Sequence, residues 1–217
     1  MNLGTRVGDD PVAVARNRAL LRALLPAEPG WLHQVHGAQV VDAAAVGAGE
    51  VDADASFATA PGHVCVVMVA DCLPVLFCDR TGTRVAVAHA GWRGLSRGVL
   101  ENTVAALGCA PSELLAYLGP AIGPERFEVG QDVVDAFLCA DRQAAECFHA
   151  KAPGPRGEAK WLADLFELAR QRLAKAGVRT VYGGVVCTYQ DSARFFSHRR
   201  DPRSGRHAAL IWLNGPA

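Results

Sequence analysis

The chain has 217 residues, of which 50% are hydrophobic and 20% are charged. This length and composition predict one domain over residues 1–217, because they can bury one sizeable core but not two independent ones. Lysine and arginine together number 22, as do aspartate and glutamate, so no general basic field exists to hold nucleic acid or an anionic membrane. The most apolar run, residues 63–70, is far shorter than a membrane span.

The cysteines and the first residues indicate a cytoplasmic protein. Seven cysteines are an odd number without the spacing of a disulfide framework, and residues 1–10 lack the apolar core of a signal peptide. We therefore expect reduced thiols. A monomer and a homodimer both remain open, since the sequence has neither a heptad repeat nor an evident apolar helix face for self-association.

The first predicted element is a helix that begins at Asp10, because aspartate is a favoured N-cap and Pro11 suits the first helical position. Pro26 closes this stretch. Its buried stripe is predicted to consist of Val14, Leu21, Leu24 and Leu25.

Short apolar runs then predict strands at residues 39–41, 64–69, 75–78, 85–88, 114–118, 181–187 and 208–213. Turn-forming residues at 79–82 predict a hairpin, and the stretch 151–160, with two prolines and two glycines, predicts a mobile loop. Helices are predicted at residues 94–107, 133–138 and 161–176. Hairpins combined with strand–helix alternation indicate an α/β fold with a mixed sheet layered with helices.

Three short motifs carry metal-capable side chains at the edges of apolar runs: HQVHG at 33–37, ADCLPVLF at 70–77 and AHAGWRG at 88–94. Folding could bring His36, Cys72 and His89 together as one thiolate and two imidazoles. Such a set resembles catalytic zinc, which keeps three protein ligands and an open fourth position. The last two motifs also follow buried strands, where ligands bind in α/β sheets. On spacing alone, an inert packed thiol at Cys72 is an equal alternative.

The two histidines of HQVHG are not equivalent. Residues three apart on a strand face opposite sides, so His33 and His36 cannot both reach one metal unless the backbone turns. His36 lies next to Gly37, where the chain can bend, and His33 is the expected bystander. The other histidines are expected to be ordinary surface or core residues: His63, His149, His198 and His207.

Two charged residues beside these motifs are candidate catalytic groups. Asp71 precedes Cys72 and is expected to orient a histidine or accept a proton, although aspartate at a strand end also forms turns. Arg93, between a tryptophan and a glycine, offers a planar donor fork that matches phosphate oxygens. A solvated arginine at a helix start is the competing interpretation.

Other polar and aromatic residues have structural interpretations that we favour. Asp52 and Asp54 would project to one side of an extended chain and could bind ribose hydroxyls, yet a solvent-facing pair is expected. Trp92 and Phe127 could stack on a purine, but aromatic residues beside glycine loops more often pack in the core. A second basic cluster is expected to be a solvated face: Arg199, Arg200 and Arg206.

Several motifs in one order resemble the bacterial YfiH family, also called laccase-domain or multicopper polyphenol oxidase proteins. The matching stretches include NLGTRVGDD, QVHG, VDADA, ADCLPVLF, VAVAHAGWRG, LGPAIGPERFEVG, CTYQDSARFFSHRRD and GRHAALIWL. The resemblance implies a single-domain YfiH-like fold and zinc held by His36, Cys72 and His89. Relatives usually carry a further N-terminal stretch, so we expect a strand and some substrate contacts to be missing before Met1.

The same resemblance implies purine nucleoside phosphorylase and adenosine deaminase activity. The candidate substrates are adenosine, inosine, guanosine and S-methyl-5'-thioadenosine, with phosphate as the second substrate. The older oxidase label would require several coppers, for which seven scattered histidines are too few, although one adventitious copper could bind.

Two other classes of function remain open. Cys72 could be the nucleophile and His89 the base of a cysteine hydrolase or deamidase, since the family fold resembles bacterial toxin deamidases with a Cys–His pair. The trio could also serve a metal-dependent binding module without catalysis. Two imidazoles converging on one thiol favour a metal over the cysteine–histidine dyad.

Overall fold

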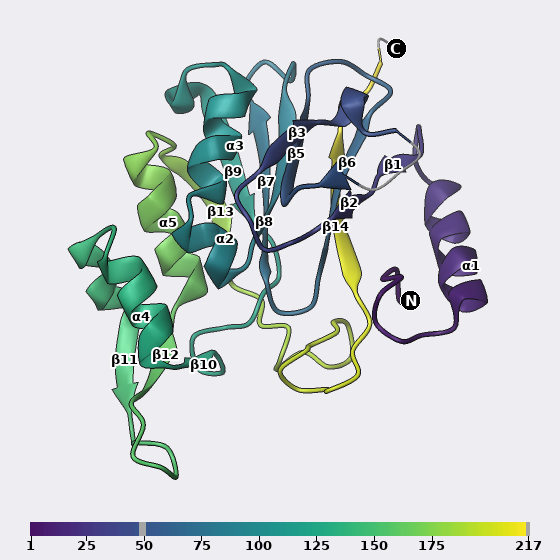
Figure 1. Ribbon diagram of the computed structural model, residues 1–217. Coiled ribbons are helices and arrows are strands. Elements are labelled where there is room, and N and C mark those ends of the chain that lie inside the picture. The colour runs from purple at the N-terminus through teal and green to yellow at the C-terminus, as the bar shows by residue number, and fades with distance from the viewer. Residues whose placement is uncertain (48–50, 216–217) are drawn as a thin grey trace.

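The computed structural model describes residues 1–47 and 51–215, and its centre is a six-stranded mixed sheet (Figure 1). The strand order is β13 (Thr180–Gly183), β9 (Leu114–Leu118), β7 (Leu73–Asp79), β8 (Val85–Ala90), β5 (Ala55–Ala58) and β3 (Val40–Asp42). The strands β7 and β8 form an antiparallel hairpin, whereas β13 runs parallel to β9 and β3 parallel to β5. The predicted mixed sheet is therefore confirmed.

Helices cover one face of this sheet (Figure 1). They are α2 (Trp92–Ser96), α3 (Val99–Leu107) and α5 (Leu165–Lys175). Their buried leucines join the inward side chains of β7 and β9 in the larger hydrophobic core, where Phe77 and Leu73 are fully buried. Burial of this apolar surface is the main term that stabilises the layered arrangement.

A second, three-stranded sheet covers the opposite face. Its order is β1 (Pro29–Gly30), β6 (Val64–Val69) and β14 (His207–Trp212), with α1 (Pro11–Arg22) beyond it at the edge of the molecule (Figure 1). Between the two sheets lies a smaller core that includes Cys65, Val67, Val85 and Val87. The helix–sheet–sheet arrangement confirms an α/β fold with helical and β layers.

The remaining elements lie at the periphery. An antiparallel sheet of β10 (Glu128–Val129), β12 (Lys160–Ala163) and β11 (Phe148–Lys151) sits beside α4 (Gln131–Leu138), and β2 (Leu32–His33) pairs with β4 (Val51–Asp52). Short 3-10 helices span Ala43–Ala45, Pro111–Glu113 and Arg142–Cys147. None of the helices within the described ranges is long and apolar enough to cross a membrane.

The predicted start of the first helix is confirmed, but only part of its predicted buried stripe is buried. The Asp10 side chain accepts a hydrogen bond from the Val12 amide at 3.0 Å, as an N-cap does. Val14 is buried, whereas Leu24 is 80% exposed. The helix ends at Arg22, so helical periodicity no longer sets the direction of Leu24.

Two helix predictions are wrong in their boundaries. The single helix expected at 94–107 is two helices, because Gly98 has a left-handed φ of 88° that a helix interior does not adopt. The helix expected from residue 161 begins at Leu165, after β12. Asp164 caps it by accepting from the amides of Phe166 and Glu167, both at 3.0 Å.

The strand expected at 181–187 is also shorter than predicted. It ends at Gly183, because Gly183 and Gly184 have left-handed φ values of 73° and 72° that turn the chain. The other predicted strands agree with observed strands to within two residues at each end, as does the helix predicted at 133–138. The stretch 151–160 connects the antiparallel strands β11 and β12, as a loop within the domain should.

Candidate metal centre

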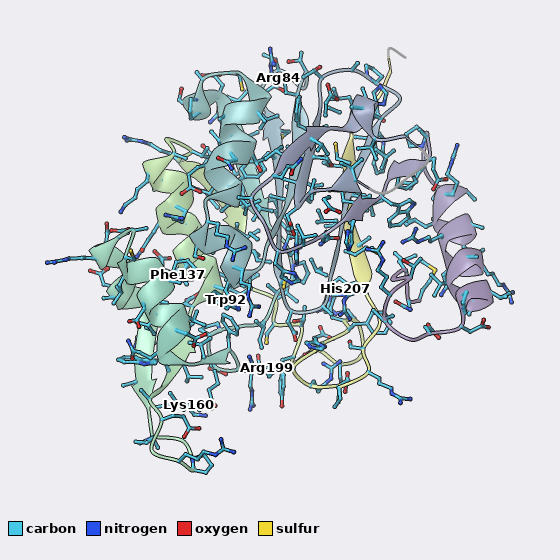
Figure 2. All side chains as sticks on the ribbon, viewed as in Figure 1. Arg84, Trp92, Phe137, Lys160, Arg199 and His207 are labelled. Atoms are coloured by element: carbon cyan, nitrogen blue, oxygen red, sulfur yellow. The ribbon has the colours of Figure 1, made fainter. Side chains whose placement is uncertain are left out.

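A pocket of about 510 Å³ lies where β6 and β8 end and β7 begins. Most of its lining comes from five segments far apart in sequence, near residues 4–7, 32–36, 68–72, 89–93 and 198–206, and Ile122, Phe127 and Leu165 complete it. Figure 2 shows the side chains of Trp92 and Arg199 at this end of the central sheet, and both line the pocket. The volume is within the range of small-molecule sites.

The three predicted metal ligands meet in this pocket. The candidate ligand atoms of His36, Cys72 and His89 all lie within 4.8 Å of one another. The Cys72 Sγ is 3.9 Å from His36 Nε2, and the two imidazole rings are 4.8 Å apart and nearly perpendicular. Among residues 1–47 and 51–215 no other three side chains form such a group. One thiolate and two imidazoles fit zinc or copper.

Local backbone geometry brings these ligands together. His36 has a φ of 57° and Asp71, just before Cys72, has a φ of 85°, so both ligand segments turn sharply. His89 points inward from β8 and is 3% exposed. At Gly91 a Cβ atom would lie 2.8 Å from the Cys72 sulfur. Only glycine leaves room for the thiol at that point.

The electrostatics of the site activate the thiol. Burial alone would raise the pKa of Cys72, but the charge of His89 and a hydrogen bond with His36 lower it to about 6. Burial alone would lower the pKa of His89, but the Cys72 charge and a hydrogen bond to Asp54 raise it to about 9. By contrast, burial raises the pKa of Cys65 to about 12. Cys72 is thus a thiolate near neutral pH, unlike an inert packed thiol.

Asp54 is the residue that sequence reasoning missed. It is fully buried, so the expectation of a solvent-facing pair is wrong for it, while Asp52 is exposed as predicted. Asp52 ends β4 and Asp54 precedes β5, so the alternation of a single strand does not apply to them. The Asp54 carboxylate accepts a hydrogen bond from His89 Nδ1 at 2.7 Å, whereas Asp52 contacts His33 at 2.6 Å.

Asp71 has different partners from those predicted. Its carboxylate accepts hydrogen bonds from Thr188 Oγ1 at 2.7 Å, Ser197 Oγ at 3.0 Å and the Arg199 amide at 2.7 Å. None of these three donors is a histidine, whereas Asp54 accepts a hydrogen bond from His89. Asp71, which also lines the pocket, instead attaches the C-terminal segment to the end of the central sheet.

Several arginines line the pocket. Arg93 is exposed, lines the pocket and has its guanidinium 4.4 Å from the Trp92 ring centroid. The expectation that Arg199, Arg200 and Arg206 form a solvated face is wrong in two respects. Arg200 donates to three backbone carbonyl groups, and Arg206 is half-buried in the pocket wall. Arg199 is exposed and also lines the pocket.

Other predicted residues have mixed outcomes. Phe127 is buried and lines the pocket, so it combines packing with access to a ligand. His33 does not join the metal group but holds Asp52. His198, treated as ordinary in the sequence, lies in the pocket lining. His207 is half-buried, and neither ring nitrogen has a hydrogen-bond partner.

The fold and the site together define a layered α/β protein with a cysteine–histidine group that could hold a metal ion at one end of its central sheet. The chain belongs to the family described as multi-copper polyphenol oxidoreductase laccase, whose profile matches residues 1–214. It is 53% identical over 214 residues to a purine nucleoside phosphorylase of Pseudomonas aeruginosa, covering 98% of this chain and 86% of that protein. The purine nucleoside phosphorylase YfiH of Escherichia coli is 51% identical over 215 residues, with the same coverage.

Solved structures agree with this assignment. A Neisseria meningitidis protein superimposes with a TM-score of 0.92 at 54% identity, covering 99% of this chain and 86% of that one. YlmD of Geobacillus stearothermophilus superimposes with a TM-score of 0.84 at 30% identity, covering 99% and 85%. The resemblance to the YfiH family and the predicted fold are confirmed.

Proposed function

We propose that this protein is a zinc-dependent purine nucleoside phosphorylase that also deaminates adenosine. The observation that carries the proposal is the convergence of His36, Cys72 and His89 in a pocket with arginines in its wall. Relatives named purine nucleoside phosphorylase support the substrate class. Adenosine, inosine, guanosine and S-methyl-5'-thioadenosine are the candidate nucleosides, with phosphate as the second substrate.

Zinc is the metal that we assign to the site. Three protein ligands leave a position open, and zinc bound there would activate water or polarise a substrate group. A multicopper centre needs several metal-binding groups, whereas residues 1–47 and 51–215 contain one. Copper binding would therefore be adventitious, and weak oxidase activity would not identify the physiological reaction.

Two charged side chains are proposed to act on the substrates. Arg93 would bind phosphate, because its guanidinium borders the pocket and is stacked on Trp92, which orients the donor fork. Asp71 would accept a proton from substrate or water, and its three donors hold the carboxylate in the pocket wall. Phe127 and Trp92 offer apolar surface to a purine.

The two reactions use different nucleophiles. In phosphorolysis a phosphate oxygen bonds to the anomeric carbon while the glycosidic bond breaks, and the base leaves with the electron pair and gains a proton. Adenosine and phosphate thus give adenine and ribose 1-phosphate. In deamination water adds to the amino-bearing carbon and ammonia leaves, giving inosine. Only the first reaction consumes phosphate.

Metal analysis and product chromatography test this proposal. Protein purified without added metal should hold about one zinc per chain, and Cys72→Ala should release it. The zinc-loaded protein should form adenine from adenosine only when phosphate is present, and inosine with or without it. Arg93→Ala should raise the phosphate requirement and spare deamination, whereas Arg142→Ala, an exposed residue of a 3-10 helix, should change neither. Absence of both products would refute the nucleoside assignment.

A cysteine hydrolase is the second candidate, and a specific geometry favours it. Asp54 holds His89, and His89 lies beside a thiol whose pKa is about 6, the same order of groups as a Cys–His–Asp triad. This alternative predicts that metal-free protein is active and that alkylation of Cys72 abolishes the activity. Retention of nucleoside without turnover at any phosphate concentration would instead indicate a binding module.

We place this activity in the cytoplasm, in one domain spanning residues 1–217. All seven cysteines are free, which suits a reducing compartment, and a single family profile matches nearly the whole chain. A monomer or a homodimer is compatible with this proposal.

A further inference from the structure

We infer that Asp54 is the positioning residue of the metal centre, because its single carboxylate fixes the orientation of both histidine ligands. This inference rests on the proposed metal site and adds a residue that does not itself contact the metal. It concerns how tightly and through which atoms the site binds zinc, so it is separable from the identity of the nucleoside.

Four donors converge on the two oxygens of Asp54. Oδ1 accepts from His89 Nδ1 at 2.7 Å and from the His36 amide at 3.0 Å. Oδ2 accepts from the amides of Gly37 at 2.6 Å and Val35 at 3.2 Å. Asp54 itself is fully buried. Because a carboxylate has about four acceptor positions, these donors occupy its whole capacity.

The first consequence concerns His89. A carboxylate can only accept, so the short contact assigns a proton to Nδ1 and makes Nε2 the nitrogen that would bind a metal after losing its own proton. Metal-binding histidines commonly donate their other ring nitrogen to such a carboxylate, which fixes tautomer and ring direction. In this protein Asp54 directs Nε2 of His89 toward Cys72 and His36.

The second consequence concerns the loop that carries His36. Three consecutive backbone amides, from Val35 to Gly37, point at Asp54 and form a concave anion-binding nest. His36 has a φ of 57°, a left-handed conformation that non-glycine residues adopt at a cost. The three hydrogen bonds to Asp54 offset that cost and hold the His36 side chain over the pocket.

Asparagine at position 54 cannot satisfy all four donors. It has nearly the same shape but one oxygen, and its amide group donates instead of accepting. Either His89 and the His36 amide or the Val35 and Gly37 amides would face another donor. We therefore expect Asp54→Asn to misorient at least one histidine even when the protein folds.

The chain provides a matched control at Asp52. Asp52 makes a similar contact, 2.6 Å to His33 Nδ1, but on an exposed strand outside the metal group. Zinc affinity, measured by competition with a chromophoric chelator, should fall about 10- to 100-fold in Asp54→Asn. In Asp52→Asn it should stay within about twofold of the parent, by the same principle. Equal affinities in Asp54→Asn and the parent would overturn the inference.

Histidine nitrogen NMR of the unaltered protein gives a second readout that does not depend on the variant folding. We expect His89 to keep its proton on Nδ1 in both metal-free and zinc-loaded protein, with zinc on Nε2. Zinc on Nδ1 of His89 would overturn the inference. A parent protein that binds zinc in this way but turns over no nucleoside would refute only the proposed reaction, whereas a parent that binds no zinc would overturn both.

Discussion

Neighbouring residues of one type have different chemistry in this protein because their surroundings differ. Asp52 and Asp54 are two positions apart, yet one lies at the surface and the other is fully buried among four donors. Burial raises the pKa of the Cys65 thiol to about 12, while two histidines lower that of Cys72 to about 6. The residue type defines what a side chain can do, and its contacts decide which of these properties it shows.

His207 gives a prediction at this scale. Its ring lies against Phe195 and Phe196, and burial lowers its pKa to about 4, with nearby Asp71 and Arg206 acting in opposite directions. An unfolded histidine titrates at about 6.5. Between these values the unfolded state binds more protons, so the stabilising contribution is complete above about pH 6.5 and is lost as the pH falls toward the folded pKa.

Urea unfolding at pH 7 and pH 4.5 tests the sign of this pH dependence of stability. His207→Leu cannot take up a proton at this position. Between pH 7 and pH 4.5 we therefore expect it to lose roughly 2 kcal/mol less of its free energy of unfolding than the parent loses. Other titrating groups affect both proteins alike, so the difference between the two profiles isolates this histidine. Parallel profiles would show that its pKa is not displaced by folding.

At the scale of elements, the ends of helices determine how the layers meet. The chain leaves α2 at Arg97 and Gly98, and Arg172 of α5 donates to the carbonyls of Leu95 at 3.0 Å and Ser96 at 2.7 Å. The Leu95 carbonyl also accepts from the Gly98 amide at 3.2 Å, a bond of the 3-10 type at the end of the helix. The break at Gly98 thus allows α5 to cap α2 and joins two helices on the same face of the sheet.

The start of α5 gives a second prediction. Asp164 satisfies two amides that lack partners within the helix, so Asp164→Ala should reduce the free energy of unfolding by about 1 kcal/mol. Asp164→Asn keeps an acceptor oxygen and should lose much less. Urea denaturation of the three proteins measures both effects. Equal losses in the two variants would mean that capping is not what Asp164 contributes.

At the scale of the whole molecule, the pocket joins segments from both ends of the chain. Asn2 accepts from the Arg206 amide at 2.7 Å, and the Leu3 amide donates to the Arg206 carbonyl at 3.0 Å, which places residues 4–7 in the wall. The metal group likewise draws on three separated segments. Such a site exists only when the chain is folded, so a ligand bound there stabilises the native state.

Zinc should therefore raise the melting temperature. Free zinc at 100 times its dissociation constant stabilises the native state by about 2.7 kcal/mol, which corresponds to roughly 5–10 °C for a chain of this size. Scanning calorimetry of Cys72→Ala should show no such rise, while Cys139→Ala, which alters an exposed free cysteine, should behave as the parent does. An equal rise in both variants would place the bound zinc elsewhere.

The sequence alone determined the features that depend on near neighbours along the chain. Apolar runs bounded by turns located β6 and β9, and Asp10 with Pro11 located the start of the first helix. The motif residues His36, Cys72 and His89 were recognised by residue type and position, and they meet as expected.

Only the tertiary structure decided the surroundings of these residues. The burial of Asp54, the half-buried position of Arg206 and the attachment of Asp71 to the C-terminal segment depend on residues distant in sequence. Local patterns encode backbone preference and which faces are apolar. They do not encode which distant donor fills the last acceptor of a carboxylate, because that is fixed only when the separated segments pack together.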